Sequence, residues 1–353
     1  MDGLSLYQQI YDLENVYKAS KKAMKGKKSK PHIAKWWLNE DANVLNIHNE
    51  LKDKSYNFGR YTEFIINDRV QRKISAAPFK DRVTHHAITN ILEPIFEKSF
   101  IYDSYSNRKY KGVSNGLKRA KYFSNKFKYI LKLDIKKYFP SIVQDVLIKQ
   151  ISKKVQDEDT LDLCKNLINN SNKQDEIINY VKGDNLFTPI EIKKGLPLGN
   201  QTSQFFGNIY LNDFDHFVKE KLRIKGYIRY VDDMIFFHND KDFLENIIEK
   251  LQFFLDAFRL KIHPLKTKLV STEKGFEFLG HKVYKTHFRV TNRGIKRARK
   301  NLKKIRYEYM YKKIDLNKAK NKIFSNIGFL NIGKGYKVSS LLLAKTSLIK
   351  RDF

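Results

Sequence analysis

The sequence predicts an α+β protein in which antiparallel strands are flanked by helices. Residues 227–230 and 234–237 are apolar and aromatic, and the polar break between them is typical of a strand, a tight turn and a returning strand. Along residues 129–135, an apolar or aromatic side chain at every second position alternates with a mixed set that includes Lys132 and Asp134, which also indicates a strand. Residues 79–96 instead carry apolar side chains at helical spacing. Since a hairpin joins neighbouring strands, we expect an antiparallel sheet.

The first 120 residues combine helices with one hairpin. Residues 1–60 are expected to form helices joined by basic connectors, and the basic segment, residues 21–30, ends at Pro31. This segment is interpreted as a solvated linker or as a contact for phosphate. A strand at 61–66 and its partner at 71–75 are expected to be joined by a turn at Asn67 and Asp68. Pro94 is expected to bend or end the helix over 79–96.

The middle of the chain alternates between strands and helices. A strand is expected within 127–143, followed by a helical, polar region over 144–192 with a loop at 169–172. A breaker cluster at 195–199 precedes a long amphipathic helix predicted for 203–221. The later elements are predicted to be a helix over 241–260, short strands at 261–263 and 269–270, and a hairpin over 276–284 around Gly280.

The tail over 291–353 has 18 Lys and Arg residues against 3 Asp and Glu residues. It is predicted to be a small helical domain with a basic face.

Composition narrows the function classes. The 353 residues include 69 Lys and Arg against 38 Asp and Glu, a formal charge of +31. A charge of this size indicates a polyanionic partner, with nucleic acid first and an acidic membrane surface second. The single cysteine, Cys164, excludes a disulfide framework and a cysteine-rich zinc site. No apolar run approaches the ~20 residues of a membrane span, and the start has no signal-peptide core, so we expect a cytoplasmic protein.

Three carboxylates stand where strands are expected to end. Asp134 closes one strand, and Asp232 and Asp233 occupy the tip of the hairpin over 227–237. Carboxylates beside apolar strands are costly unless they are paired or bind metal. If the strands are neighbours, Asp134 and Asp232 face each other and could bridge two Mg²⁺ ions ~3.5–4 Å apart, as in phosphoryl transfer. The alternative is that Asp232 and Asp233 are ordinary turn formers.

The order of the motifs resembles that of reverse transcriptases. Tyr230–Asp233 resembles their catalytic box, and Leu133–Ile142 resembles their first palm motif. The fingers motifs have counterparts in Arg72–Ser75, Lys80–Arg82 and Asn107–Arg108. Gly195–Gln204 resembles the loop and helix at the templating pair, Lys261–Lys268 resembles the fourth palm motif, and Phe276–His281 resembles the primer grip.

The resemblance implies a right-hand polymerase with fingers, an antiparallel-sheet palm and a small helical thumb. Its implied units are an N-terminal extension and fingers over 1–120, a palm over 121–285 with a finger insertion at about 144–192, and a basic thumb over 286–353. The implied activity is RNA-directed DNA synthesis with two Mg²⁺ ions, possibly replaced by Mn²⁺. The implied partners are an RNA template and primer, the DNA product and dNTPs, with a structured RNA or an accessory protein. We see no endonuclease or protease segment and expect priming to use other factors.

The resemblance also implies roles for single residues. Asp134 and Asp232 would bind both metals, Asp233 would complete the acidic cluster, and the carbonyl of Ile135 would be a further ligand. Lys266 could protonate the leaving pyrophosphate, although a solvated turn residue is the alternative. The residues implied at the nucleotide are Arg72, Arg108, Ile135, Phe139, Leu198, Gly199 and Tyr230. The residues implied at the nucleic acid are Lys80, Arg82, Ser203, Gln204, Phe278, Leu279, Gly280, Lys296, Arg297, Lys300 and Lys304.

Two positions in the motifs refine the expectation. An aromatic residue at Phe139 would block a 2′-hydroxyl and select DNA synthesis over RNA synthesis; a core phenylalanine is the alternative. Leu198 before Gly199, with Gln204 after Ser203, resembles the diversity-generating retroelement group, although Val231 departs from its usual methionine. Antiphage-defence reverse transcriptases share much of this pattern and remain open, as does a non-catalytic RNA-binding protein.

Overall fold

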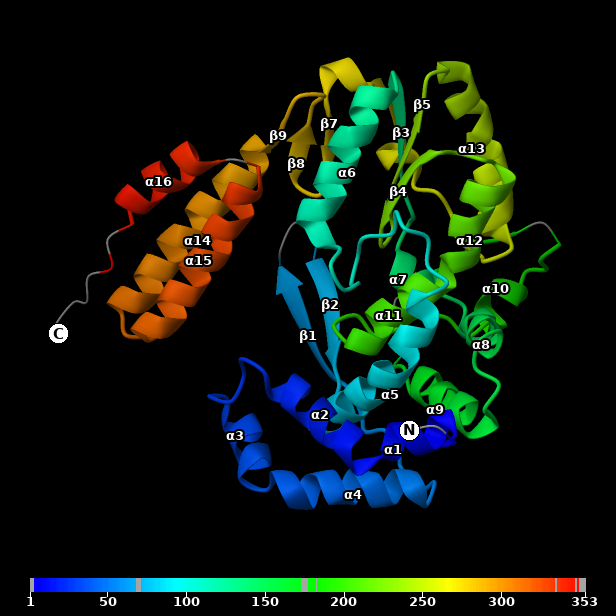
Figure 1. The fold of residues 1–353 in the computed structure, drawn as a ribbon, viewed down its shortest axis with the longest axis vertical. Coiled ribbons are helices and arrows are strands. Elements are labelled where there is room, and N and C mark those ends of the chain that lie inside the picture. Colours follow the sequence, from blue (N-terminus) through cyan, green and yellow to red (C-terminus); the bar gives the residue numbers. More distant parts are fainter. Residues whose placement is uncertain are drawn as a thin grey trace.

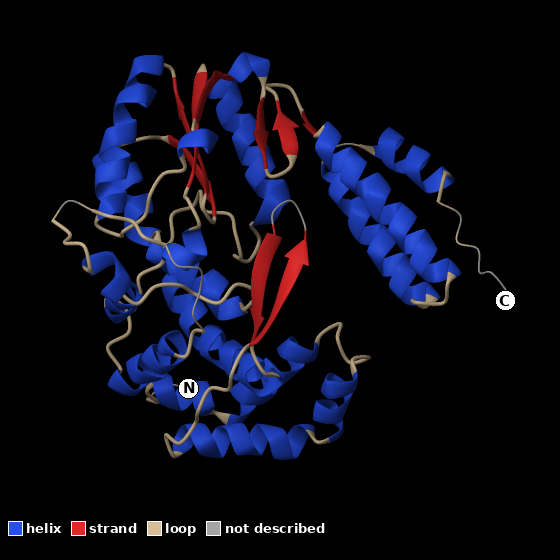
Figure 2. Ribbon diagram, turned by 180° about the vertical axis from the view of Figure 1, so that it is seen from behind, coloured by secondary structure: helices blue, strands red, loops and turns tan. Residues whose placement is uncertain are grey.

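The computed structural model describes residues 3–67, 71–172, 177–181, 183–333, 335–346 and 348. Asp68, one of the two predicted turn formers, lies outside the described residues, as do residues 349–353 of the predicted basic tail. Two of the antiparallel sheets stand in the upper part of the molecule and the third, a two-stranded hairpin, lies below them at mid-height, with helices on both sides and below (Figures 1 and 2). The predicted α+β class is confirmed.

The N-terminal region is helical, as predicted. Ser5 and Gln8 form a capping box at the first helix, and Asp12 caps the second by accepting from the N–H groups of Glu14 and Asn15. Its helices surround the longer helix α5, on which the basic segment's first residues also pack. The elements are α1 (Leu6–Tyr11), α2 (Leu13–Met24), α3 (Pro31–Leu38), α4 (Glu40–Lys52) and α5 (Phe79–Glu97).

Two predictions for this region need correction. The expected linker over 21–30 is shorter, because α2 continues to Met24 and its apolar face is buried. Pro94 does not end α5, which continues for three more residues to Glu97, so this part of the prediction that Pro94 bends or ends the helix is wrong. A proline this close to the end of a helix removes one backbone hydrogen bond from the last turn, and the buried side chain of Phe96 holds that turn against the core.

The central sheet is four-stranded with the order β4-β5-β3-β6, and all its pairs are antiparallel. Leu131 and Leu133 of β3 face the main core, whereas Ile130 faces a second core beneath helix α6. This alternation explains the predicted strand pattern. The elements are β3 (Tyr129–Asp134), β4 (Gly226–Tyr230), β5 (Asp233–His238), β6 (Lys268–Ser271) and α6 (Gly112–Lys126).

Two smaller sheets complete the strands. The predicted hairpin near residues 61–75 is present, and so is the hairpin around Gly280, whose turn holds Leu279 and Gly280 at φ of 47° and 78°. A third strand joins the latter hairpin without having been predicted. These strands are β1 (Thr62–Asn67), β2 (Gln71–Ala76), β7 (Phe276–Phe278), β8 (His281–Val283) and β9 (Phe288–Val290).

The helix predicted over 203–221 is broken after Tyr210. The Tyr210 hydroxyl donates to the Phe258 carbonyl at 2.7 Å and accepts from the Val143 N–H at 3.2 Å, and the chain then turns at Leu211. Residues 261–263 form only an isolated bridge from Ile262 to Ile135 instead of a strand. The helices here are α7 (Tyr138–Ser141), α8 (Gln144–Ser152), α9 (Glu158–Asn169), α10 (Thr188–Glu191), α11 (Gln201–Tyr210), α12 (Asn212–His216), a π-helical turn (Phe217–Lys221), α13 (Lys241–Asp256) and 3₁₀ turns at Pro264–Lys266 and Thr272–Lys274.

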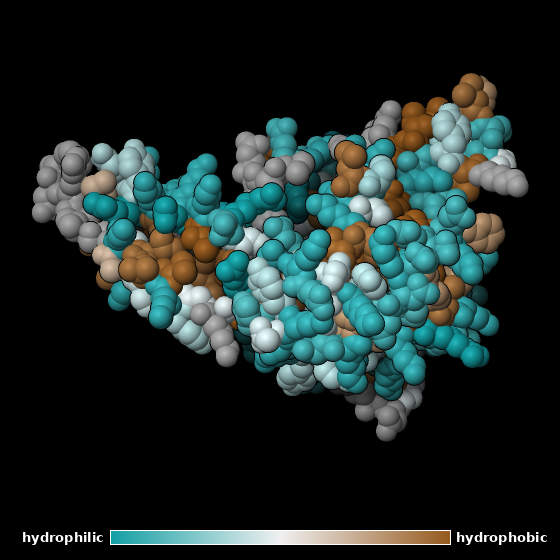
Figure 3. Space-filling model, turned by 90° about the horizontal axis from the view of Figure 1, so that it is seen from above, coloured by the Kyte–Doolittle hydropathy of each residue, from teal (hydrophilic) through white to brown (hydrophobic). Residues whose placement is uncertain are grey.

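The tail forms helices α14 (Asn292–Met310), α15 (Leu316–Ile332) and α16 (Tyr336–Ala344), as predicted, and projects to one side (Figure 1). These helices share their own core, which includes Leu302, Ile305 and Leu330. Seen from above, the surface is mostly hydrophilic, and one of its apolar patches, at the left of the view, lies over this unit (Figure 3). Among the described helices, none combines the length and the apolar character needed to cross a bilayer.

Candidate functional site

The three predicted carboxylates meet at one end of the central sheet. Strands β3 and β5 are neighbours, and their register pairs Asp134 with Asp233. Asp232 lies in the turn that joins β4 to β5. The strand register sets Asp134 opposite Asp233, while the charge of Asp134 also acts on Asp232, so that Asp134 lies close to both carboxylates of the turn. Together Asp134, Asp232 and Asp233 form what we call the carboxylate cluster.

Like charges and desolvation act together on this cluster. Desolvation, followed by the charge of Asp134 and then that of Asp233, raises the pKa of Asp232 to about 6. Desolvation also raises the pKa of Asp233, against the opposing effect of Lys132. Carboxylates that repel each other in this way are stabilised by a cation among them.

Two lysines supply positive charge to the cluster. Lys266 Nζ lies 2.9 Å from Asp134 Oδ2, and Lys132 Nζ lies 3.2 Å from Asp233. In the part of the chain that the structure describes, no group of three or more His, Cys, Asp or Glu side chains is arranged to hold a metal ion by itself. The predicted residue Lys266 is thus brought to the cluster, while Lys132 was not anticipated.

The donor set nevertheless fits a hard divalent cation. Asp134 Oδ1 is inaccessible to solvent and has no hydrogen-bond partner among the described residues. The bridge from Ile135 to Ile262 uses the Asp134 carbonyl and the Lys136 N–H, which leaves the Ile135 carbonyl outside that bridge. Carboxylate and carbonyl oxygens are the ligands that Mg²⁺ prefers. Displacement of the lysine ammonium groups would open these oxygens to the ion.

A buried ion pair supports the turn that carries Asp232. Val231 has φ of 58°, a left-handed conformation that is costly for a β-branched residue. Arg229 Nη1 donates to the Val231 carbonyl at 3.3 Å, and the same guanidinium pairs with Asp215 of α12 at 2.6 Å. Both charged side chains have no exposed surface, and Tyr227 donates to Asp215 at 2.8 Å.

Neither Arg229 nor Asp215 was among the predicted site residues. Its signal was present, since Arg229 is the one basic residue in the apolar run over 227–237. A buried guanidinium needs a carboxylate partner. The helix is interrupted after Tyr210, and Asp215 on the following helix, α12, contacts Arg229.

The predicted nucleotide loop is fastened to hairpin β1–β2. The Leu198 carbonyl accepts from the Ser75 N–H at 3.0 Å, and the Asn200 amide donates to the Ser75 carbonyl at 2.9 Å. Gly199 has φ of 113°, and a Cβ there would stand 2.8 Å from Ile74 Cγ2, so only glycine fits. Arg72, the predicted phosphate ligand, is exposed on β2, the strand to which the loop is hydrogen-bonded.

Phe139 and Tyr230 are both partly buried near the cluster. The Phe139 ring lies 5.3 Å from that of Tyr138, and its edge approaches Gly207 of α11, where an added Cβ would stand 3.2 Å away. Tyr230 pairs with Asp233 across the turn. Each ring is therefore only partly accessible to a ligand.

Three cationic side chains that were predicted to bind nucleotide or nucleic acid use some or all of their hydrogen-bond donors within the protein. Arg108 has a side chain 5% exposed and donates to Glu97 and to two backbone carbonyls. Lys80 Nζ contacts both oxygens of Glu50 at 2.5 and 2.6 Å. In this structure the donors of both side chains are directed to acidic partners, Glu97 and Glu50, and their roles at nucleotide or nucleic acid stay predictions. Arg82 donates Nε to the Ala77 carbonyl at 2.8 Å but also lines a cavity.

The remaining predicted ligands divide between interior and surface. Ser203 is buried and donates to the Pro197 carbonyl at 2.7 Å, and Phe278 is fully buried, so both predictions of nucleic-acid contact are corrected to packing roles. Gln204 is exposed and lines the same cavity as Arg82. Leu279 and Gly280 lie at the turn of the β7–β8 hairpin; Leu279 is half-buried and Gly280 lies close to Phe329. On α14, Arg297 is half-buried, whereas three lysines are exposed: Lys296, Lys300 and Lys304.

Comparison with known proteins gives related sequences and folds. The chain is 21% identical over 257 residues to Protein YkfC of Escherichia coli, covering 62% of this chain and 64% of that protein. It is 23% identical over 150 residues to the putative COX1/OXI3 intron 2 protein of Saccharomyces cerevisiae, covering 42% of this chain and 16% of that protein. The chain thus spans less than two thirds of the length of these relatives.

The fold has a counterpart among solved structures. Apo telomerase from Candida tropicalis superposes with a TM-score of 0.50 at 13% identity, over 88% of this chain and 65% of the telomerase chain. This likeness supports the right-hand polymerase fold. The family model for reverse transcriptase (RNA-dependent DNA polymerase) matches residues 67–283, which include the carboxylate cluster and the loop at Gly199. The chain therefore belongs to the reverse transcriptase (RNA-dependent DNA polymerase) family.

Proposed function

We propose that this protein is an RNA-directed DNA polymerase that synthesises cDNA by nucleotidyl transfer at the carboxylate cluster. One observation carries the proposal: Asp134, Asp232 and Asp233 converge at a sheet end, where Asp134 Oδ1 is buried without a hydrogen-bond partner among the described residues. The family membership gives this convergence its chemistry.

Asp134, Asp232, Asp233 and the Ile135 carbonyl would hold two Mg²⁺ ions, which Mn²⁺ could replace. When bound, such ions stabilise the attacking and the leaving oxygens of an in-line phosphoryl transfer. Arg72, exposed on β2, would bind the triphosphate of the incoming nucleotide through its planar guanidinium. Lys266 would give a proton to the leaving pyrophosphate from its position beside Asp134.

The proposed partners are an RNA template with its primer, dNTPs, the DNA product and a structured RNA or accessory protein, in the cytoplasm. The proposed units are fingers, palm and thumb. The boundary at residue 120 falls inside α6 (Gly112–Lys126), so the first unit would end before Gly112. Residues 286–353 would grip the duplex backbone through exposed lysines of α14.

Primer extension on a defined RNA template tests the proposal. We expect the purified protein to extend a DNA primer with dNTPs and Mg²⁺ but not with rNTPs. Extension with rNTPs alone would indicate an RNA polymerase. RNA binding without any extension, with either nucleotide set and with either Mg²⁺ or Mn²⁺, would indicate the non-catalytic alternative.

Phe139 is predicted to select the sugar. Replacing it with alanine or valine should admit rNTPs, because the ring would otherwise fill the space of a 2′-hydroxyl. The measurement is the ratio of dNTP to rNTP incorporation, with Tyr138→Phe as the control for disturbance of the neighbouring ring. Unchanged discrimination with a lower unfolding temperature would assign Phe139 to the core.

Leu198 is predicted to lower fidelity, in line with the proposed likeness to diversity-generating retroelement enzymes. An apolar side chain offers shape contact without a directional hydrogen bond, and such a bond is worth roughly 0.5–1.5 kcal/mol, a few-fold to about tenfold in selectivity. We expect Leu198→Gln to reduce the error rate by that factor, measured by sequencing products from a defined RNA. A wild-type error rate no higher than that of ordinary reverse transcriptases would favour the defence role.

A further inference from the structure

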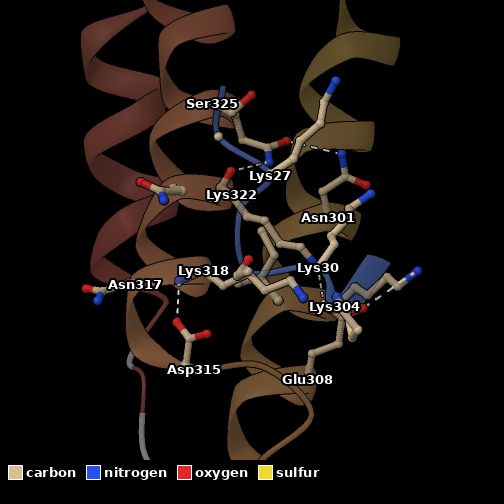
Figure 4. A pocket seen from close by; sticks show the side chains of 16 residues that line it. Lys27, Lys30, Asn301, Lys304, Glu308, Asp315, Asn317, Lys318, Lys322 and Ser325 are labelled. Carbon is tan, nitrogen blue, oxygen red and sulfur yellow. Dashed lines mark hydrogen bonds and ion pairs between the residues drawn. The ribbon is translucent and has the colours of Figure 1, made fainter. Parts of the chain in front are cut away.

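One groove differs in charge from the other cavities outside the carboxylate cluster. Figure 4 shows one of those cavities, about 1010 Å³, where Lys27 and Lys30 lie beside lysines of the C-terminal helices. The groove, about 560 Å³, lies between α13 and the segment over 262–267. Among its described lining residues there is no lysine or arginine, although the chain has a formal charge of +31. We call it the α13 groove.

The α13 groove exposes large apolar side chains. Phe253, on the α13 wall, is 82% exposed, and Ile248, Ile262 and Pro264 complete the apolar lining. Leu265, which follows Pro264 in the second wall, is 85% exposed. Apolar side chains of this size, gathered on both walls of one groove, are typical of a surface that another molecule covers.

The charge of the groove is negative. Glu249 and Asp256 line it, and α13 as a whole carries four acidic residues against two lysines. Lys261 pairs with Asp256 at 2.6 Å, whereas Glu249 has no ion-pair partner among the described residues. Such a lining repels nucleic acid and anionic lipid headgroups. It favours a protein segment that combines apolar side chains with lysine or arginine.

Both walls of the groove are held in place by hydrogen bonds. Gln252 of α13 donates to the Leu260 carbonyl at 3.0 Å and accepts from the Ile262 N–H at 2.9 Å. The same segment is tied to β3, because the His263 N–H donates to the Asp134 carbonyl at 2.7 Å. A groove that is already formed loses little conformational freedom when it is occupied.

We propose that the α13 groove binds an amphipathic helix of a partner protein, with lysine or arginine beside its apolar face. Apolar side chains at i, i+3 or i+4, and i+7 of that helix would enter the groove next to Phe253. The carboxylates of α13 also recur at helical spacing, at 242, 245, 249 and 256, so a helix lying along α13 can meet several of them. This inference gives a surface to the accessory protein among the proposed partners, and it does not depend on polymerase activity.

The experiment measures binding of two fluorescent peptides to the full chain. Each has about 18 residues, about five helical turns, and carries leucine along one face. The other positions are lysine in the first peptide and glutamate in the second. The net charge of the protein repels the leucine–lysine peptide and attracts the leucine–glutamate peptide. Binding of the leucine–lysine peptide therefore requires a local surface that is both apolar and acidic.

We expect the leucine–lysine peptide to bind saturably and Phe253→Ser to weaken that binding about tenfold or more, as for an aromatic anchor of an interface. Leu38→Ser is the matched control, because Leu38 is 77% exposed at the end of α3. Both variants should keep the unfolding temperature of the wild type, since both side chains are exposed.

Glu249→Gln should weaken binding of the leucine–lysine peptide about two- to fivefold at low salt and less at high salt. Glu158→Gln, an exposed change on α9, should not weaken it. Binding of the leucine–glutamate peptide should be the same in all these variants and the wild type.

Three results would overturn the proposal: no binding of the leucine–lysine peptide, equal affinity of Phe253→Ser and the wild type, or an equal loss in Leu38→Ser. Sedimentation of the wild type and of Phe253→Ser tests a different occupant. Self-association that disappears in the variant would assign the groove to a second copy of this chain and would likewise overturn it. Peptide binding is measured without nucleotide, so failure of the polymerase proposal would leave these results unchanged.

Discussion

Asp232→Ala is expected to abolish nucleotide addition while leaving the affinity for RNA nearly unchanged. The substitution removes a carboxylate from the group that would hold metal, and the loss of one such electrostatic contact costs about 10²–10³-fold in rate or more. The residues proposed to bind the template are cations outside the cluster, so we expect its binding not to fall. Single-nucleotide extension and RNA affinity are measured side by side.

Asp242→Ala is the control for this experiment, because Asp242 is exposed in the first turn of α13 and lies outside the cluster. Asp134→Ala should behave as Asp232→Ala does. Extension by Asp232→Ala within tenfold of the wild type would remove the two-metal assignment.

Arg229→Met is expected to lower the free energy of unfolding by about 3–5 kcal/mol, because it leaves Asp215 buried and unpaired. It also removes the donor to the Val231 carbonyl, so the strained turn beside Asp232 should relax. Arg229 is thus a positioning residue. We expect kcat of the folded variant to fall more than the affinity for dNTP.

Arg229→Met combined with Asp215→Leu separates stability from positioning. The double variant should regain much of the lost stability, since no buried charge remains unpaired. It should not regain kcat, because the Val231 carbonyl still lacks its donor. Lys225→Met, an exposed change next to β4, is the control. An unfolding free energy of Arg229→Met within about 1 kcal/mol of the wild type, well below the expected loss of about 3–5 kcal/mol, would contradict the role of the ion pair.

Local patterns predicted most strands and helices but not where long-range contacts intervene. The alternation over 129–135 survives because Leu131 and Ile130 face two different cores. The apolar spacing over 203–221 continues without interruption, so nothing local marks the break after Tyr210. That break depends on the hydroxyl of Tyr210 reaching Phe258, 48 residues away.

The carboxylates of the site could be predicted, because the free-energy cost of placing a carboxylate beside apolar strands can be inferred from the sequence. The ion-pair partners of the charged side chains could not be predicted. Arg108 and Lys80 stand in motifs that resemble phosphate ligands, yet Glu97 and Glu50 occupy their donors. In the sequence pattern, Lys132 is an ordinary polar residue of a strand, and only the pairing of β3 with β5 brings its side chain to Asp233.

The strand order also governs when the site can form during synthesis. β3 lies between β5 and β6, and both of these neighbours follow it in the chain. Lys132 and Asp233 are 101 residues apart, and Asp134 and Lys266 are 132 apart. A ribosome adding ~5–20 residues per second needs roughly 5–20 s to add the 101 residues up to β5 and roughly 7–26 s to add the 132 up to Lys266, just before β6. Until β5 is made both edges of β3 lack their partners, and exposed strand edges invite pairing with other chains. Nascent chains that stall before β5 should therefore depend on chaperones more than the completed protein does.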